Sequence, residues 1–221
     1  MRSADTINRR QVLDTLAATV FGPDRAVGVV QIAGADPGAL FDVEKSAMVC
    51  AIPARQQEFT AGRLAARLAM AQNRSIPMAL NRAPVWPEGL SGSITHAGGW
   101  ALAIVGAAES MVGTDLEMDE DLPTDVWSTV LTEVERAWVT TQKAPGRAAR
   151  LIFSIKECVY KAQFPRSQQI FGFEVLNVTV RPERAEFEAV YQEDIAPFQT
   201  GDAIAGRYSI DGGLILTGVF Q

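Results

Sequence analysis

The sequence has few of the residues that build metal clusters or disulfide frameworks. Its 221 residues include one histidine, His96, and two cysteines, Cys50 and Cys158. Two thiols form no disulfide framework, and with a single histidine they leave a zinc site short of ligands. Long apolar runs are also missing: the longest nearly continuous one, residues 98–108, has eleven residues, whereas a membrane-spanning helix needs about 20. No apolar signal-peptide stretch follows the N-terminal arginines, so we expect a cytoplasmic protein without a membrane span.

Lysine is scarce, and the charge is unevenly spread along the chain. There are four lysines against sixteen arginines, and the net charge of −6 argues against a general nucleic-acid binder. Residues 55–82 hold five arginines and one acid, residues 109–135 hold nine acids and no base, and residues 136–166 hold seven bases and one acid. Such blocks are often solvated helix faces. Two basic blocks around an acidic one also suit a site that holds a polyanion together with a metal ion.

Hydrophobic periodicity predicts a soluble α+β protein. Apolar residues make up 48% of the chain and charged residues 21%, which is typical of a globular domain. Helices mixed with antiparallel strand pairs favour an α+β fold over a doubly wound sheet. Residues 106–110 indicate a turn that joins two strands, and residues 73–92 indicate an ordered loop. The pattern predicts helices at 7–21, 54–72, 123–140 and 148–162, and strands at 27–33, 100–105, 111–117, 173–180, 185–191 and within 204–219.

Two carboxylates are predicted to share one face of a strand. In the segment Gly113-Thr-Asp-Leu-Glu117, residues two apart point to the same side of a strand, so Asp115 and Glu117 project together. Like charges this close repel unless a cation lies between them. A solvent-facing edge strand shows the same pattern, so the segment alone does not identify a metal site.

A second charged segment, Phe153-Ser-Ile-Lys-Glu-Cys-Val-Tyr-Lys161, lies in a predicted helix. Steps of four, three and four residues place Arg150, Ser154, Glu157 and Lys161 on one stripe. An ordinary amphipathic helix would look the same. Together with His96, at the end of Gly92-Ser-Ile-Thr-His96, the two segments supply hard oxygen ligands and cationic donors. This set favours magnesium and a phosphate-rich substrate.

These segments resemble motifs of the 4'-phosphopantetheinyl transferases, in particular the surfactin-type enzymes and the enterobactin synthetase component D type. Those enzymes show a G-[IV]-D-x-E strand followed by an [FW]-[ST]-x-K-E-x-x-x-K helix. In this sequence the two motifs are Gly113–Glu117 and Phe153–Lys161, with 39 residues from Glu117 to Lys156. Thr114 departs from the first motif. The enterobactin subgroup adds P-x-W-P-x-G and G-S-[IL]-[ST]-H segments, present here at 84–89 and 92–96, and an upstream arginine helix, present at 55–67. The resemblance covers residues 50–221.

The resemblance implies a fold and an activity. The fold would be a monomeric pseudo-dimer of two α+β halves, residues 1–110 and 111–221, with the active site in the cleft between them. The activity would be magnesium-dependent transfer of 4'-phosphopantetheine from coenzyme A to a serine hydroxyl of an apo acyl or peptidyl carrier protein. Adenosine 3',5'-bisphosphate would be released, and manganese could replace magnesium. Polyketide, non-ribosomal peptide, siderophore and fatty-acid carriers all remain open.

The resemblance also implies roles for particular residues. The metal ligands would be carboxylates, and Glu157 would take the serine proton, directly or through a metal-bound water. The pyrophosphate would contact Lys161 and His96, with Lys156 nearby. Arginines would hold the 3'-phosphate, and two hydroxyls would line the nucleotide pocket. The corresponding residues are Asp115, Glu117 and Glu157 for the metal, Arg55, Arg63 and Arg82 for the phosphate, and Ser93 and Thr95 for the nucleotide.

Other interpretations stay open at this point. The same carboxylates could serve an unrelated magnesium-dependent phosphotransferase or phosphodiesterase that needs no carrier, and a non-catalytic homologue could keep the coenzyme A pocket. For a carrier protein with an acidic helix, the best basic patch in the sequence is Arg147, Arg150 and Arg166.

Overall fold

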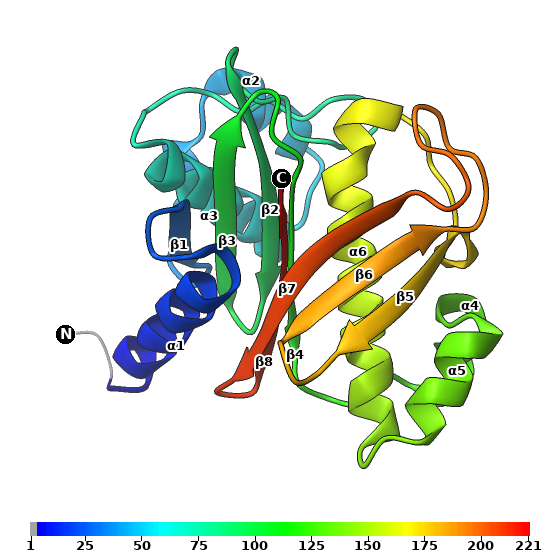
Figure 1. The fold of residues 1–221 in the computed structure, drawn as a ribbon. Coiled ribbons are helices and arrows are strands. Elements are labelled where there is room, and N and C mark those ends of the chain that lie inside the picture. Colours follow the sequence, from blue (N-terminus) through cyan, green and yellow to red (C-terminus); the bar gives the residue numbers. More distant parts are fainter. Residues whose placement is uncertain (1–3) are drawn as a thin grey trace.

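Two antiparallel sheets, each packed against one long helix, make up the fold (Figure 1). The structure is a computed structural model that describes residues 4–221. The first part of the chain contains α1 (Ala4–Phe21), β1 (Ala26–Gln31), α2 (Asp42–Lys45), α3 (Pro53–Met70), β2 (Leu90–Ala97) and β3 (Trp100–Ala107). The second contains β4 (Val112–Met118), α4 (Trp127–Val130), α5 (Glu133–Thr140), α6 (Pro145–Ser167), β5 (Leu176–Arg181), β6 (Glu186–Tyr191), β7 (Ala203–Asp211) and β8 (Leu214–Phe220).

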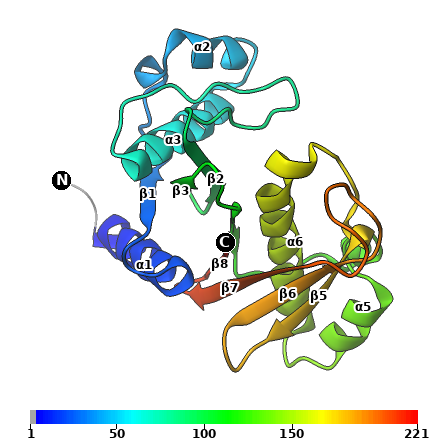
Figure 2. The same cartoon turned by 45° about the horizontal axis from the view of Figure 1, so that its top comes forward.

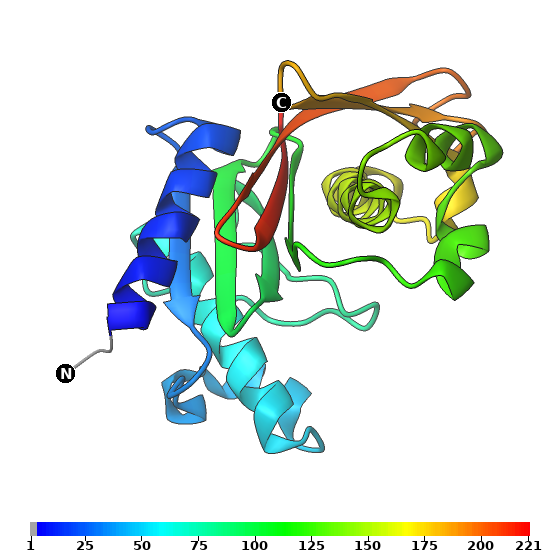
Figure 3. The ribbon, with the colours of Figure 1, turned by 90° about the horizontal axis from the view of Figure 1, so that it is seen from below.

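The sheets keep to the two parts of the chain. The smaller sheet has the order β1-β3-β2, with α3 packed on β1 and β3. The larger sheet has the order β4-β8-β7-β6-β5 and curves around α6, which Figure 3 shows nearly end-on. This arrangement of helices and antiparallel sheets confirms the α+β class.

In each part, a glycine in the first strand lets the long helix approach closely. A Cβ at Gly28 of β1 would overlap the backbone of α3 at Ala65 and Ala69, and a Cβ at Gly113 of β4 would overlap α6 at Cys158 and Ala162. The two contacts have the same four-residue spacing on their helices. No repeat in the sequence reveals this correspondence, because only the glycines and small helix residues are shared.

A buried glutamate recurs in both parts as well. Glu44 of α2 and Glu135 of α5 each stand three residues after the N-cap residue of their helix. Glu44 accepts a hydrogen bond from the backbone N–H of the N-cap Phe41, and Glu135 accepts one from the backbone N–H of the N-cap Thr132. Both are almost completely buried. Each also pairs with a cation from its half's long helix and accepts a backbone N–H from the chain that follows that helix. The two parts thus share a buried glutamate at a helix start, although its cationic partner stands at different positions of the two long helices.

Helix α1 joins the two parts from behind. Leu13 and Leu16 pack in one core with Leu116 of β4 and Leu216 of β8 from the larger sheet, and with Val29 and Leu102 from the smaller one. At its polar edge, Arg9 donates to the Gly212 carbonyl and Arg10 donates to the Val29 carbonyl at 3.0 Å. Helix α1 therefore packs on β7 and β8 of the larger sheet and also contacts β1 of the smaller one.

Three sequence-based expectations were wrong in detail. Strands 100–105 and 111–117 do not form a hairpin: β3 pairs with β1 and β2, whereas β4 pairs with β8, so the turn between them crosses from one sheet to the other. Strand β2 was not predicted, because its serines, threonine and histidine hide the alternation. The expected helix 123–140 breaks at Leu131, where the backbone is extended and Thr132 caps α5.

Helix α2 was not predicted either, and the remaining elements follow the predictions to within a few residues. Residues 71–89 contain no helix or strand apart from an isolated bridge between Met78 and Pro84. Segment 204–219 divides into β7 and β8 at the turn that contains Gly212 and Gly213. Within residues 4–221, none of the helices combines the length and apolar character that crossing a bilayer requires.

Replacing Gly113 by alanine tests the close packing of β4 on α6. The added methyl group would overlap the α6 backbone, and forcing an extra carbon into a packed core costs about 1–3 kcal/mol. We expect Gly113→Ala to lower the free energy of unfolding by about this amount in a urea titration. The exposed Thr179→Ala on β5 serves as a control and should stay within about 0.5 kcal/mol of wild type. Equal stability of both variants would show that the helix can move away.

Candidate active site

A cleft of about 710 Å³ opens between the two parts of the chain. Their long helices, α3 and α6, lie on different sides of the molecule in Figure 2. One wall comes from α3, β2 and the loop around Arg82, and the other from β4 and α6. Its volume falls within the range of small-molecule sites. The cleft brings together nine of the residues proposed from the sequence: Arg55, Arg63, Arg82, Ser93, Thr95, His96, Asp115, Glu117 and Lys161.

Two hydroxyls hold the floor of the cleft together. Strands β2 and β4 belong to different sheets, yet the Ser93 Oγ accepts from the Thr114 N–H at 3.1 Å and the Thr95 Oγ1 accepts from the Leu116 N–H at 2.9 Å. All four residues are buried. The hydroxyls thus satisfy backbone donors that have no neighbouring strand to pair with. Ser93 and Thr95 line the cleft, as expected, and also connect its walls.

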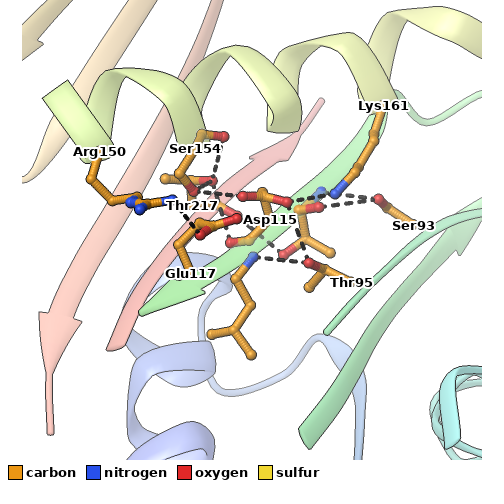
Figure 4. Close-up of polar contacts among 10 residues, drawn as sticks. Ser93, Thr95, Asp115, Glu117, Arg150, Ser154, Lys161 and Thr217 are labelled. Atoms are coloured by element: carbon orange, nitrogen blue, oxygen red, sulfur yellow. Dashed lines mark hydrogen bonds and ion pairs between the residues drawn. The ribbon is translucent and has the colours of Figure 1, made fainter. Parts of the chain in front are cut away.

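Asp115 is the most heavily bonded carboxylate of the site (Figure 4). Its Oδ1 lies 2.5 Å from the Lys161 Nζ and 3.3 Å from the Thr95 Oγ1, and its Oδ2 accepts from the Ser154 Oγ at 2.9 Å. Burial alone would lower the pKa of Lys161, but the charge and hydrogen bond of Asp115 outweigh it and raise this pKa. Lys161 is therefore protonated at neutral pH, and its side chain remains 27% exposed.

Glu117 and Glu157 are less well compensated. Burial, followed by the charge of Asp115, raises the pKa of Glu117, although Arg150 lies 3.2 Å from its Oε2. Burial also raises the pKa of Glu157, and there Lys161 opposes the charge of Asp115. Glu157 borders a second cavity of about 230 Å³, which meets the main cleft at Tyr160. The three carboxylates therefore repel one another, and the charges of Arg150 and Lys161 only partly offset the effects that raise the pKa values of Glu117 and Glu157.

This donor set fits a magnesium ion. Among the described residues, no three carboxylate, histidine or cysteine groups stand close enough to enclose a metal by themselves. Magnesium does not require such a cage, because it is usually held by one or two carboxylates together with substrate phosphates and water. Asp115 and Glu117 point from one strand face into the cleft, where the repulsion that raises the pKa of Glu117 favours a cation.

The opposite wall is cationic. Arg55 donates to the Glu58 carboxylate at 3.1 Å and lies 3.2 Å from the His96 Nε2, which must accept because a guanidinium only donates. Burial, only partly offset by Glu58, lowers the pKa of His96, so its ring favours the neutral form at neutral pH. Arg82 lies on the loop in a left-handed conformation, with φ of 70°.

Arg63 is the most buried cation that lines the cleft. Its Nε donates to the Ile76 carbonyl at 2.6 Å, and its guanidinium stacks 4.1 Å from the centre of the Phe59 ring. Burial lowers its pKa to about 10, which still leaves it protonated at neutral pH. Within residues 4–221 no carboxylate forms an ion pair with Arg63, so its charge is available to an anion in the cleft.

The structure does not place Lys156 in this cleft, contrary to the expectation that it lies near the pyrophosphate. Its ammonium group is 1% exposed, pairs with Glu135 at 2.7 Å and donates to the Val130 and Phe173 carbonyls. The reason is helical geometry: residue 156 directly precedes Glu157 and points to a different side of α6. When the α3 residues that contact Gly28 are aligned with the α6 residues that contact Gly113, Lys156 of α6 corresponds to Arg63 of α3.

The proposed basic patch is also changed by the structure. Arg150 is bonded to Glu117 and to the Asp121 carbonyl, and its side chain is only 19% exposed. Arg147 pairs with Asp119, and Arg166 donates to the Glu109 carbonyl. The three do not form a set of free surface cations, because neighbouring acceptors from the 109–121 segment occupy them.

Several cleft residues were missed by the sequence interpretation. Tyr160 and Phe164 line the cleft from α6, and Phe59 and Trp86 line it from the other wall. The α6 pair could have been found by extending the Glu157 stripe by three and then four residues. Trp86 stood inside a recognised motif but had no assigned role. Thr114, which departs from the strand motif, is buried and donates to the Thr217 carbonyl.

Comparison with known proteins decides the family. Residues 43–106 match the 4'-phosphopantetheinyl transferase N-terminal domain, and residues 111–209 match the 4'-phosphopantetheinyl transferase superfamily. The chain belongs to the 4'-phosphopantetheinyl transferase superfamily. The first match contains the cationic wall and the second contains the carboxylates and Lys161. This phosphopantetheinyl transferase therefore builds its cleft from both matched segments, with α1 outside them.

Individual relatives agree with this assignment. The chain is 32% identical to the 4'-phosphopantetheinyl transferase Npt of Nocardia iowensis, over 80% of this chain and 86% of the relative. It is 30% identical to the 4'-phosphopantetheinyl transferase PptT of Mycobacterium tuberculosis, over 94% and 96%. It is 35% identical to enterobactin synthase component D of Salmonella typhi, over 57% and 55%. The recognition from motifs is confirmed, and the chain is a transferase of the kind that modifies carrier proteins with coenzyme A as the donor.

Replacing Thr95 by valine tests the junction between the two walls of the transferase cleft. The change keeps the shape but removes the acceptor of the Leu116 N–H, and an unsatisfied buried donor costs about 1–3 kcal/mol. Thr60→Val is the matched control: Thr60 is also buried, but its hydroxyl only donates to the Gln56 carbonyl of its own helix. We expect thermal unfolding to show a larger decrease in melting temperature for Thr95→Val than for Thr60→Val. Equal losses would contradict a special role of the junction.

Proposed function

We propose that this protein is a cytoplasmic, magnesium-dependent enzyme that transfers 4'-phosphopantetheine from coenzyme A to a serine hydroxyl of an apo acyl or peptidyl carrier protein. Adenosine 3',5'-bisphosphate leaves in the same step. The observation that carries the proposal is the opposition of two walls in one cleft: three arginines, one of them buried, on one side, and mutually repelling carboxylates with Lys161 on the other. Coenzyme A, with a pyrophosphate and a separate 3'-phosphate, matches both walls at once.

The cationic wall binds the nucleotide end of coenzyme A. Arg63 and Arg55 hold the 3'-phosphate, for which a fork of guanidinium donors suits a dianion, and Arg82 adds a third cation at the rim. Neutral His96 donates to a pyrophosphate oxygen from the ring nitrogen that Arg55 does not occupy. Lys161 reaches the pyrophosphate from α6. Ser93 and Thr95 shape the base of the pocket through their bonds to β4.

The carboxylates serve the transfer itself. Asp115 and Glu117 would hold the magnesium ion, with Glu157 as the third ligand or as the acceptor of the serine proton, directly or through water. When bound, the ion supplies charge neutralisation at the pyrophosphate. The raised pKa of Glu157 makes it a better proton acceptor than an exposed glutamate. The serine oxygen attacks the phosphorus next to pantetheine, a P–O bond forms, and the pyrophosphate bond breaks.

The two halves divide this work as residues 1–110 and 111–221, within one monomeric chain. The division is supported by the positions of the two matched segments on either side of residue 110. The name of the Salmonella typhi relative, enterobactin synthase component D, suggests a siderophore pathway as one setting. Polyketide, peptide and fatty-acid carriers present the same serine chemistry to the cleft.

Replacing Asp115 by alanine tests the metal role. Without one carboxylate the ion is bound weakly and Lys161 loses its partner, so we expect transfer to a carrier protein to fall at least about a hundredfold at saturating magnesium. The rate is measured by intact-protein mass spectrometry of the carrier, and circular dichroism checks the fold. Glu120→Ala removes an exposed carboxylate three residues beyond Glu117 and should retain near-wild-type transfer. A near-wild-type rate for Asp115→Ala would refute the metal assignment.

Replacing Arg63 by alanine tests the nucleotide assignment. Charge-assisted hydrogen bonds to phosphate are worth about 1.5–3 kcal/mol, so coenzyme A should bind about tenfold weaker or more. Dephospho-coenzyme A, which lacks the 3'-phosphate, should lose much less affinity. Calorimetry measures both ligands, and the exposed Arg74→Ala is the control for a general loss of positive charge. Equal losses for the two ligands would contradict a 3'-phosphate role.

A further inference from the structure

Glu44 lies outside the cleft and has no place in the proposed reaction, yet both oxygens of its carboxylate are fully engaged. The residue is 0% exposed. Its Oε1 accepts from the Ile76 N–H at 2.7 Å, and its Oε2 accepts from the Phe41 N–H at 2.9 Å and forms an ion pair with Arg67. It is thus fixed by α2 on one side and by α3 on the other.

Arg67 ties the same carboxylate to the loop that follows α3. Its Nη1 donates to the Ala39 carbonyl at 3.1 Å, and its Nε donates to the Arg74 carbonyl at 3.3 Å. The backbone of residues 74–76 is therefore held at two points, the Arg74 carbonyl and the Ile76 N–H. Since residues 71–89 contain no helix and no named strand, these side-chain contacts take over the role of regular secondary structure there.

The peptide groups around Ile76 connect this buried pair to the cleft. The N–H of Ile76 faces Glu44, while its carbonyl accepts from the Arg63 Nε at 2.6 Å. The Nε bond and the stacking on Phe59 leave the two terminal nitrogens of Arg63 for a ligand in the cleft. The orientation of Arg63 therefore depends on where the Ile76 carbonyl is held, and that position depends on Glu44.

Charge adds to this geometric dependence. Arg67 and Arg55 of α3 both repel Arg63, and this repulsion adds to burial in disfavouring the charged form of Arg63. Glu44 is the carboxylate that acts against this repulsion. Glu44 neutralises Arg67 directly. The charges left for an anion in the cleft are therefore those of Arg63 and Arg55.

We propose that Glu44 is a positioning residue for 3'-phosphate selectivity: through the Ile76 peptide it aims Arg63 into the cleft, and thereby sets the preference for coenzyme A over dephospho-coenzyme A. The inference rests on the proposed function, because it takes the 3'-phosphate as the ligand of Arg63. Glu44 does not line the cleft, and although it lies within the matched N-terminal domain, it precedes the motifs that carried the resemblance.

The opposite half provides a matched control. Glu135 has the same buried environment, helix-start bond and ion pair as Glu44, and accepts from the Val178 N–H at 2.7 Å. No cleft arginine is bonded through Val178 among the described residues. If a buried glutamate acts only on stability, Glu44→Gln and Glu135→Gln should behave alike toward the two ligands.

The test compares the two variants in the full-length protein. A glutamine at position 44 turns its NH2 group toward either the Ile76 N–H or Arg67, so a donor faces a donor. We expect calorimetry to show coenzyme A binding weakened about threefold to tenfold in Glu44→Gln, with dephospho-coenzyme A changed less than about twofold. Glu135→Gln should lower the melting temperature but leave the ratio of the two affinities at its wild-type value. Glu44→Gln combined with Arg63→Ala should lose no more selectivity than Arg63→Ala alone, since both act on one group.

Each other outcome is decisive. The inference is overturned if Glu44→Gln folds and either weakens the binding of both ligands equally or leaves both affinities unchanged. It is also overturned if the losses of selectivity in Glu44→Gln and Arg63→Ala add fully in the double variant. If Arg63→Ala itself keeps the preference for coenzyme A, the 3'-phosphate assignment fails and the inference fails with it. If Arg63→Ala loses the preference for coenzyme A but Glu44→Gln keeps it, the 3'-phosphate assignment of Arg63 stands and the positioning role of Glu44 is wrong. Should Glu44→Gln not fold, the neutral pair Glu44→Gln with Arg67→Gln removes both buried charges together and is read by the same ratio.

Discussion

The cleft depends on two strands that lie side by side without pairing. β2 ends the smaller sheet and β4 ends the larger one, and the hydroxyls of Ser93 and Thr95 satisfy the β4 backbone where a continuous sheet would use carbonyls. Because side chains make this junction, the two sheets do not have to continue in one surface, and a cleft opens between their helices. Thr95 also donates to Asp115, so the contact that joins the halves fixes the central carboxylate as well.

Charge is handled differently inside the scaffold and in the cleft. Glu44 with Arg67 and Glu135 with Lys156 are buried pairs in which oxygens and ammonium or guanidinium groups find close partners. Burial lowers the pKa of Lys156 as well, but Glu135 opposes this directly. In and beside the cleft, burial pushes Arg63, Glu117 and Glu157 toward their neutral forms with weaker compensation. Such a site is costly for the empty protein and favourable for a ligand that brings phosphates and a divalent cation together. Stability is thus given up where binding needs it, and binding of the ligand restores it.

The sequence predicted local features well and long-range features poorly. Helical period alone placed Arg150, Ser154 and Lys161 on one stripe, and the structure directs all three toward the β4 carboxylates. The expectation that Lys156 lies near the pyrophosphate came instead from the motif resemblance, and it failed because one residue of rotation moves a side chain off the stripe. The expected hairpin of β3 and β4 failed because a short turn between apolar strands does not reveal a change of sheet. Glu44 could not be found from the sequence, since its partners at 67 and 76 are brought together only by the fold.

The most direct test of the central claim uses the wild-type protein with coenzyme A, Mg²⁺ and an apo carrier protein, followed by intact-protein mass spectrometry of the carrier. A parallel carrier has alanine in place of the reactive serine, and a third reaction contains no carrier. The account predicts that the carrier gains the mass of one phosphopantetheine only when the serine and Mg²⁺ are present, and that adenosine 3',5'-bisphosphate appears in equal amount. Cleavage of coenzyme A without a carrier, or no mass gain although coenzyme A binds, would contradict it.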